Sequence, residues 1–295
     1  MLFSTLLLMC VAVPVQDPPA APATQDAAPA SAAAAVPAET PENVRTYLTE
    51  AQSHLYDPQA AGLKSLAFDV EIDMPQIGHL GVVHVTWNAG ESAKTEFKAD
   101  ESAALPAGAP PGMIEAQSNA TAQQLLGGML NRSIASLLDE GVATMAGVQE
   151  NLVAVSHHHP AAEAQGVKSQ VYLFDDEGRL KKSTTEVEQQ GMTIKIAQNY
   201  SWKPATEGSE LLVADAQTVE AKFGPMTQTS QATFTYVQVG PIVLPVRIAT
   251  SSKGPMSGEQ VIAASNLVVN GQATPTDAVP ATPGDPAAAR KPQGG

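Results

Sequence analysis

Residues 66–74 read LAFDVEIDM, and apolar and acidic side chains alternate along this segment. Successive side chains of a β-strand point to opposite faces of a sheet. The alternation therefore predicts a strand with one buried face and one solvated face. The apolar positions are Phe68, Val70, Ile72 and Met74, and the acidic positions between them are Asp69, Glu71 and Asp73.

The segments that follow extend this pattern into a series of strands. Residues 82–89 place Val83, Val85 and Trp87 on one face, and residues 94–99 form a third short strand. Later in the chain come eight further strand-like segments, with turn signals between them and no helical pattern. This order predicts an antiparallel meander. The eight segments are residues 150–157, 168–175, 179–188, 192–202, 209–223, 227–239, 244–252 and 259–270.

Residues 41–56 have helical spacing and predict a helix at the start of the folded part. Thr40 is a suitable N-cap, Pro41 fits the first helical position, and Pro58 ends the segment. The apolar positions recur three and four residues apart, which is typical of an amphipathic helix. They are Val44, Leu48, Ala51 and Leu55.

Residues 121–140 predict a second helix. Thr121 and Gln124 form a capping box, which favours a helix start at this point. Gly127 and Gly128 each cost about 1 kcal/mol of helix stability relative to alanine, so they indicate close packing or a hinge. The apolar stripe consists of Leu126, Met129, Leu130, Ile134, Leu137 and Leu138.

Together these elements predict an α+β fold. We expect one curved antiparallel sheet, a half-open barrel of about nine to eleven strands. The two helices should cover its concave face, because an open sheet must bury its apolar face against another layer.

The two ends of the chain differ in composition from this folded part. Residues 1–15 are a short apolar run that resembles a secretory signal peptide and is too short for a transmembrane helix. Residues 16–40 and 272–295 are rich in alanine and proline and lack large apolar side chains, so we expect both to be disordered. Residues 41–271 remain as a single domain with enough residues for a full core.

The charge and the cysteine content exclude several classes of partner and chemistry. The formal net charge is −14, whereas binding of nucleic acid or of an anionic bilayer needs a basic surface. Cys10 is the only cysteine, so a chain that loses its signal peptide has no thiol for disulfides or catalysis. Lipidation of Cys10 is the less favoured alternative, because Met9 stands where a lipobox has a small residue.

Two late segments carry a family resemblance. Residues 171–191 turn from one strand into its partner through an FD..G.L pattern, and residues 234–254 run through an LP pair. With the order of helices and strands, these segments resemble the periplasmic lipoprotein carriers of the LolA/LolB-like fold, over about residues 41–270. No position matches the lipid-contacting arginine of that family. The motif positions are Phe174, Asp175, Gly178, Leu180, Leu244 and Pro245.

The resemblance implies a hydrophobic cavity between sheet and helices, suited to an acyl chain. The alternative is a fully packed core that binds no ligand. Apolar side chains of the first hairpin, the second helix and one later strand are the candidates for the lining. They are Phe68, Val70, Ile72, Val83, Val85, Trp87, Leu126, Leu130, Ile134, Ile194 and Ile196.

Catalytic motifs are missing from the sequence. The chain contains no HExxH, GxSxG, GxGxxG or Walker A pattern, so we expect neither an enzyme nor a cofactor. The acidic positions of residues 69–73 are the solvated face of a strand. Asp175 to Gly178 form an ordinary turn rather than a calcium loop, because the spaced oxygen ligands of an EF-hand are missing.

Three consecutive histidines, His157, His158 and His159, are the remaining candidate for a metal site. Alternation along a strand places His157 and His159 on one face and His158 on the other, and Pro160 marks the end of that strand. Zinc usually has three or four protein ligands, and nothing in the sequence brings His79 and His84 to the same place. We therefore favour exposed, neutral histidines at a strand end.

The favoured hypothesis is a secreted or periplasmic protein of a bacterial envelope that holds a lipid or another hydrophobic group and has no enzymatic activity. The first alternative is a structural or interaction domain with an envelope protein partner and no small ligand. A metal-dependent enzyme that uses the histidines is the least favoured.

Overall fold

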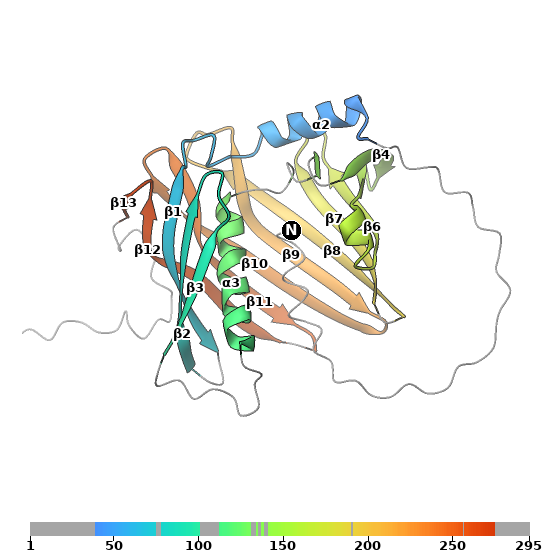
Figure 1. Cartoon of the computed structure of the whole chain (residues 1–295). Coiled ribbons are helices and arrows are strands. Elements are labelled where there is room, and N and C mark those ends of the chain that lie inside the picture. Colours follow the sequence, from blue (N-terminus) through green and yellow to red (C-terminus); the bar gives the residue numbers. More distant parts are fainter. Residues whose placement is uncertain are drawn as a thin grey trace, which may run out of the picture.

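The computed structural model describes residues 39–74, 78–100, 112–130, 134, 137–138, 141–189, 191–255 and 257–274. The predicted signal peptide and nearly all of the two predicted disordered tracts lie outside these residues. The described part is dominated by one 13-stranded antiparallel sheet that curves around helix α3 (Figure 1). No helix among the described residues is long and apolar enough to cross a membrane.

The helices are α2 (Glu42–Ser53), α3 (Met113–Leu130) and α5 (Pro160–Glu163). The first six strands are β1 (Ser65–Met74), β2 (Gly78–Asn88), β3 (Lys94–Ala99), β4 (Val142–Gln149), β5 (Leu152–His158) and β6 (Val167–Phe174). The remaining strands are β7 (Leu180–Gln189), β8 (Met192–Pro204), β9 (Leu212–Phe223), β10 (Met226–Val239), β11 (Ile242–Lys253), β12 (Gly258–Val269) and β13 (Gln272–Ala273).

The order of the strands shows how the two halves of the sheet are joined. Strands β4 to β12 form a continuous meander, and β1 pairs antiparallel with β12, so that Leu66 lies opposite Val269. The order is therefore β3-β2-β1-β12-β11-β10-β9-β8-β7-β6-β5-β4, with β13 beside β12. The sheet is open, with β3 and β4 at its edges, which confirms the predicted antiparallel architecture.

The predicted number of strands, about nine to eleven, is too low. Strand β4 was not predicted. Its pairing with β5 shifts register between Met145 and Gly147, and Gly147 has a φ of 89°. A bulge of this kind breaks the alternation from which a strand is recognised. Strand β13 has two residues, which is too short to leave any pattern.

The first predicted helix is present, but its cap differs from the prediction. Pro41 occupies the N-cap position, and the helix ends at Ser53 and not at residue 56. Thr40 has a different role, because its hydroxyl accepts a hydrogen bond from the backbone N–H of Ala143 at 3.0 Å. It ties the start of the domain to edge strand β4.

The second predicted helix begins eight residues earlier than expected, at Met113. Thr121 is therefore not an N-cap. It lies inside α3, where its hydroxyl donates to the carbonyl of Gln117 at 3.0 Å. This back-bonding to the preceding turn is the other common use of a threonine hydroxyl, and it is compatible with a helix interior. Most of residues 131–140 lie outside the described part.

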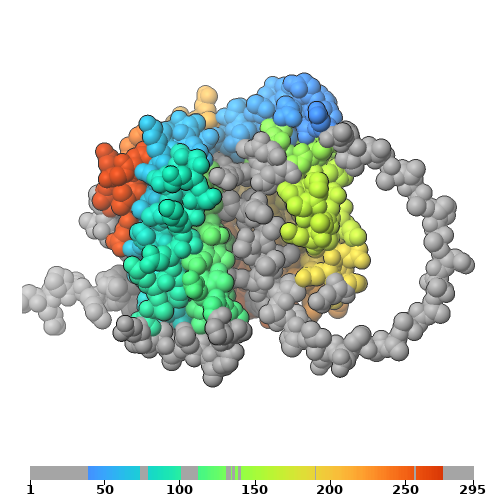
Figure 2. Space-filling model, viewed as in Figure 1, coloured from blue at the N-terminus to red at the C-terminus, as the bar shows by residue number. Residues whose placement is uncertain are grey.

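Two separate cores hold the helices against the sheet. In one core α3 packs on β2, β3, β11 and β12, and this core also includes β1; Phe68 of β1 and Leu125 of α3 are completely buried in it. In the other core α2 packs over β4 to β8, where Leu48 and Phe174 are completely buried. Each such side chain contributes roughly 1.5–3 kcal/mol of hydrophobic stabilisation. Figure 2 shows α2 along one end of the molecule and the strands β1 to β3 forming a wall beside α3.

Candidate functional site

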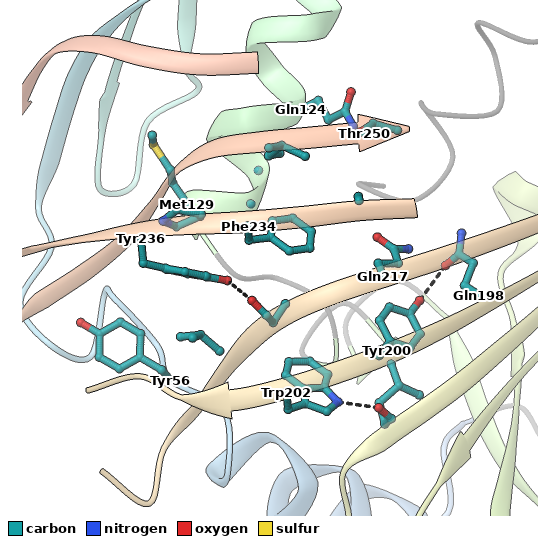
Figure 3. A pocket seen from close by; sticks show the side chains of 18 of the residues that line it. Tyr56, Gln124, Met129, Gln198, Tyr200, Trp202, Gln217, Phe234, Tyr236 and Thr250 are labelled. Atoms are coloured by element: carbon teal, nitrogen blue, oxygen red, sulfur yellow. Dashed lines mark hydrogen bonds between the residues drawn. The ribbon is translucent and has the colours of Figure 1, made fainter. Parts of the chain in front are cut away.

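A cavity of about 140 Å³ lies on the inner face of strands β8 to β11, between the two cores (Figure 3). Helix α3 forms one wall, and the segment after α2 closes one end with Tyr56. Alternation along the strands directs every second side chain into the cavity. The lining includes Gln198, Tyr200 and Trp202 of β8, and Ala232, Phe234 and Tyr236 of β10.

The two glycines of α3 also line the cavity. A Cβ atom built on Gly128 would lie 3.8 Å from Cγ of Pro245, an ordinary van der Waals distance. Gly127 and Gly128 therefore leave room beside the sheet that larger side chains would fill. At Gly128 the backbone is therefore not in the close contact with its neighbours that the sequence suggested as one reading of the glycine pair.

Two aromatic side chains of the lining are fixed through their polar atoms. The indole N–H of Trp202 donates to the carbonyl of Leu180 at 2.6 Å, and the hydroxyl of Tyr236 donates to the carbonyl of Ala214 at 2.7 Å. Burial raises the pKa of Tyr236, and the charge of nearby Asp215 raises it further. Both rings therefore present apolar surface to the cavity and have their polar atoms engaged elsewhere.

Tyr56 anchors the end of the cavity. Its hydroxyl donates to the carbonyl of Pro241 at 2.9 Å and accepts from the backbone N–H of Val243 at 2.8 Å. Both partners belong to the turn between β10 and β11 or to the start of β11. The contact links the segment after α2 to the sheet, 187 residues later in the chain.

A polar cluster occupies the β8 side of the cavity. The hydroxyl of Tyr200 donates to Oε1 of Gln198 at 2.6 Å (Figure 3). The hydroxyl of Ser183 donates to the same oxygen at 3.3 Å. Burial raises the pKa of Tyr200 well above its ordinary value, although its hydrogen bond with Ser183 offsets part of the effect. Tyr200 therefore remains a neutral hydrogen-bond donor at physiological pH.

The lining formed by described residues contains no aspartate, glutamate, lysine, arginine or histidine. A cation does lie near one wall, since Nζ of Lys203 is 5.2 Å from the ring centroid of Tyr236. The same ammonium group pairs with Asp215 at 3.0 Å, so its charge is compensated. The cavity is an apolar site with a few neutral polar groups, which is typical of small-molecule sites.

The eleven lining candidates from the sequence lie elsewhere, in packed cores, and none of them lines this cavity. Alternation identifies the inner face of a strand, but it does not show whether a helix or a cavity lies opposite. Ile134 belongs to the core under α2, and Ile194 and Ile196 pack together with Ala221. The core under α3 contains Phe68, Val70, Ile72, Val83, Val85, Trp87, Leu126 and Leu130.

The FD..G.L pattern forms the turn between β6 and β7. Asp175 organises this turn, because its carboxylate accepts from the backbone N–H of Arg179 at 2.8 Å and from its guanidinium Nε at 2.8 Å. Gly178 has a φ of 73° and lies against Ala51 of α2. Leu180 then enters the core and reaches the cavity. The turn is thus held by protein contacts, as expected for a structural turn.

The three consecutive histidines have separate structural roles. His157 is buried, whereas His158 lies on the other face, where its Nδ1 is 3.5 Å from the carboxylate of Glu163. His159 caps α5, since its Nδ1 accepts from the backbone N–H of Ala162 at 3.2 Å. Among the described residues, none of the three belongs to a group of three or more side chains able to hold a metal ion. The prediction that all three are exposed is wrong for His157, which is buried, and the other two are half-buried.

Histidines also pair with carboxylates on the outer face of the first hairpin. His84 lies 2.7 Å from Asp69, and His79 lies 3.0 Å from Asp73. Glu71, Asp73 and His79 can bring one ligand atom each to within 4.8 Å of one another. All three are exposed, which is typical of a solvated strand face.

Comparisons with known proteins identify no family. No protein-family model matches the sequence, and none of the curated proteins compared with it matches. A chain from the MucA/MucB complex of Pseudomonas aeruginosa is 9% identical, over 78% of this chain and 95% of that chain, with a TM-score of 0.20. Similarity at this level carries no conclusion about fold or function, so the resemblance to the lipoprotein carriers stays a prediction.

Proposed function

We propose that the protein is a non-enzymatic binding protein that holds an apolar group, such as part of an acyl chain, in the cavity between α3 and strands β8 to β11. The apolar lining of this cavity carries the proposal. The side chains of Trp202, Phe234 and Ile248 offer surface that an apolar ligand would remove from water. The signal-like residues 1–15 support a secreted or periplasmic location.

The size of the cavity limits what it holds. A volume of about 140 Å³ is close to that of a dry engineered cavity of about 150 Å³ that binds benzene. A whole membrane lipid is much larger than this volume. The proposal is therefore that a segment of an acyl chain, or another small apolar group, enters the cavity while the rest of the ligand lies outside.

The test combines co-purification with probe binding. Protein purified from its native host is extracted with organic solvent, and mass spectrometry identifies lipid that has remained bound. Purified protein is then titrated with the uncharged fluorescent probe N-phenyl-1-naphthylamine, whose emission rises in an apolar site. Absence of both lipid and probe binding in the folded protein would refute the proposal.

A pair of matched variants assigns the binding to this cavity. Gly128→Leu places a larger side chain on the cavity wall of α3, and it should abolish most of the probe signal. Gln123→Leu makes a similar change at an exposed position of the same helix, and it should leave the signal unchanged. Equal loss in both variants would locate the probe elsewhere.

A second candidate, a protein-interaction domain, is favoured by edge strand β4. This strand has no charged residue and exposes Met145 and Val148, whereas the opposite edge strand β3 carries Lys94, Glu96 and Lys98. Uncharged edge strands are available for pairing with a strand of another chain. A photo-crosslinking amino acid at Val148, activated in the native host, should yield a defined adduct if a partner pairs there. An absence of adducts would count against this candidate.

A further inference from the structure

Resting on the proposed function, we infer that the cavity selects uncharged ligands with a hydrogen-bond acceptor, such as an ester- or amide-linked acyl group, over free fatty-acid carboxylates. Of the three glutamines in the lining, the two neighbours on β8 and β9, Gln198 and Gln217, would recognise the acceptor through their amides. The inference concerns the chemical class of the ligand and therefore goes beyond apolar binding alone.

The orientation of the Gln198 amide is the first observation. Its Oε1 accepts the short hydrogen bond from Tyr200, at 2.6 Å, so its Nε2 is directed away from that hydroxyl (Figure 3). Nε2 of Gln198 has no hydrogen-bond partner among the described residues, although only 9% of the residue is exposed. A donor of this kind, in a mostly buried residue at the cavity wall, favours a ligand that brings an acceptor.

The position of Gln217 is the second observation. It lies on β9 directly opposite Tyr200 in the β8–β9 register, and its side chain lines the same cavity. The diagonal neighbours of an antiparallel pair have Cα atoms about 7–8 Å apart, so the two amides flank Tyr200 within reach of one ligand group. Within the described part of the chain, the Gln217 amide makes no hydrogen bond. The β8–β9 side of the cavity thus offers two neutral amides to a ligand.

The third observation is the charge of the lining. An ionised carboxylate that leaves water for an apolar site costs free energy unless a cation pairs with it. The lining formed by described residues contains no cation, and the ammonium group of Lys203 is paired with Asp215 at 3.0 Å. A free fatty acid should therefore enter mainly in its protonated form. Esters and amides meet no such penalty, and their carbonyl oxygens match the amide donors.

The experiment compares three competitors that share one acyl chain: the free acid, its methyl ester and its primary amide. Each displaces N-phenyl-1-naphthylamine from the wild-type protein near neutral pH, below the critical micelle concentration. We expect the ester and the amide to compete at least about tenfold better than the acid, because the unpaired carboxylate must be desolvated. The acid should gain affinity as the pH falls toward its carboxyl pKa, whereas the ester should not.

Two variants test the role of the amides. Gln198→Leu and Gln217→Leu should each weaken ester binding by roughly fivefold to tenfold, as the loss of one hydrogen bond predicts. Gln123→Leu, on the exposed face of α3, should have no effect. Circular dichroism establishes that each variant is folded. Because the two amides lie on different strands, a similar loss of ester binding in both variants excludes a local structural change at one position as the cause.

Each remaining outcome has a defined meaning. If the wild-type protein binds neither the probe nor any of the three competitors, the proposed function itself fails. If the acid and the ester compete equally, or if ester binding survives both leucine variants, the inference is overturned and apolar binding stands. Stronger binding of the acid that disappears in Lys203→Ala would also overturn it, because Lys203 would then act as the counter-ion.

Discussion

Replacement of Gly128 by alanine should stabilise the protein. Glycine in a helix interior costs about 1 kcal/mol relative to alanine, and Gly128 lies inside α3. The added methyl group would meet Pro245 at 3.8 Å, so it fits without a clash. Burial of about one methylene equivalent adds up to about 0.8 kcal/mol. We therefore expect the free energy of unfolding to rise by about 1–2 kcal/mol.

Urea denaturation followed by tryptophan fluorescence measures this change, with an unchanged dependence on denaturant as the sign of a pure stability effect. Gly178→Ala is the matched control. Gly178 has a φ of 73°, a conformation that alanine adopts only with strain, so this variant should lose about 1 kcal/mol or more. A loss of stability in Gly128→Ala would contradict this prediction and indicate that α3 needs glycine for its conformation.

Three further predictions concern buried tyrosines and a turn that hold the fold together. Tyr56→Phe should lower the free energy of unfolding by about 1–3 kcal/mol in chemical denaturation, because a buried backbone N–H of β11 loses its acceptor. Asp175→Ala should lower it by about 1.5–3 kcal/mol, and Asp175→Asn by less, because only alanine removes every acceptor from the backbone N–H of Arg179. Burial raises the pKa of Tyr200 and Tyr236, so above a pH of about 10 these phenols ionise in the unfolded chain while they stay neutral in the folded protein. The free energy of unfolding should therefore fall by about 1.4 kcal/mol per pH unit for each of the two tyrosines. Denaturation midpoints that are independent of pH in this range would contradict the last prediction.

The regular part of the fold was predictable because its pattern is local. The alternation of residues 66–74 identified β1 without any tertiary information, and the spacing of Val44, Leu48 and Ala51 identified α2. The start of α3 was not predictable in the same way. Thr121 is a residue type that is common at N-caps, and only the extra helical turns from Met113 onward show that it lies inside the helix.

The cavity was harder to predict for a physical reason. Its lining mixes Gln198, Gln217 and Ser230 with aromatic and aliphatic residues, so the inner faces of these strands do not read as purely apolar. The most regular apolar faces, such as that of Phe68 and Val70, belong to packed cores. A binding site needs imperfect packing and a few polar groups, and both weaken the sequence pattern. The glycine pair of α3 lines the cavity, but the sequence predicted only close packing or a hinge there.

The pairing of β1 with β12 has a consequence for how the chain folds. Leu66 must find Val269 across most of the domain, so the first hairpin gains its neighbour only when nearly the whole chain is present. Such distant contacts slow folding, because the chain loses the entropy of closing a long loop before the contact contributes any stabilisation. During synthesis the first three strands therefore emerge long before their partner, and the sheet can be completed only after the last long strand, β12, has been made.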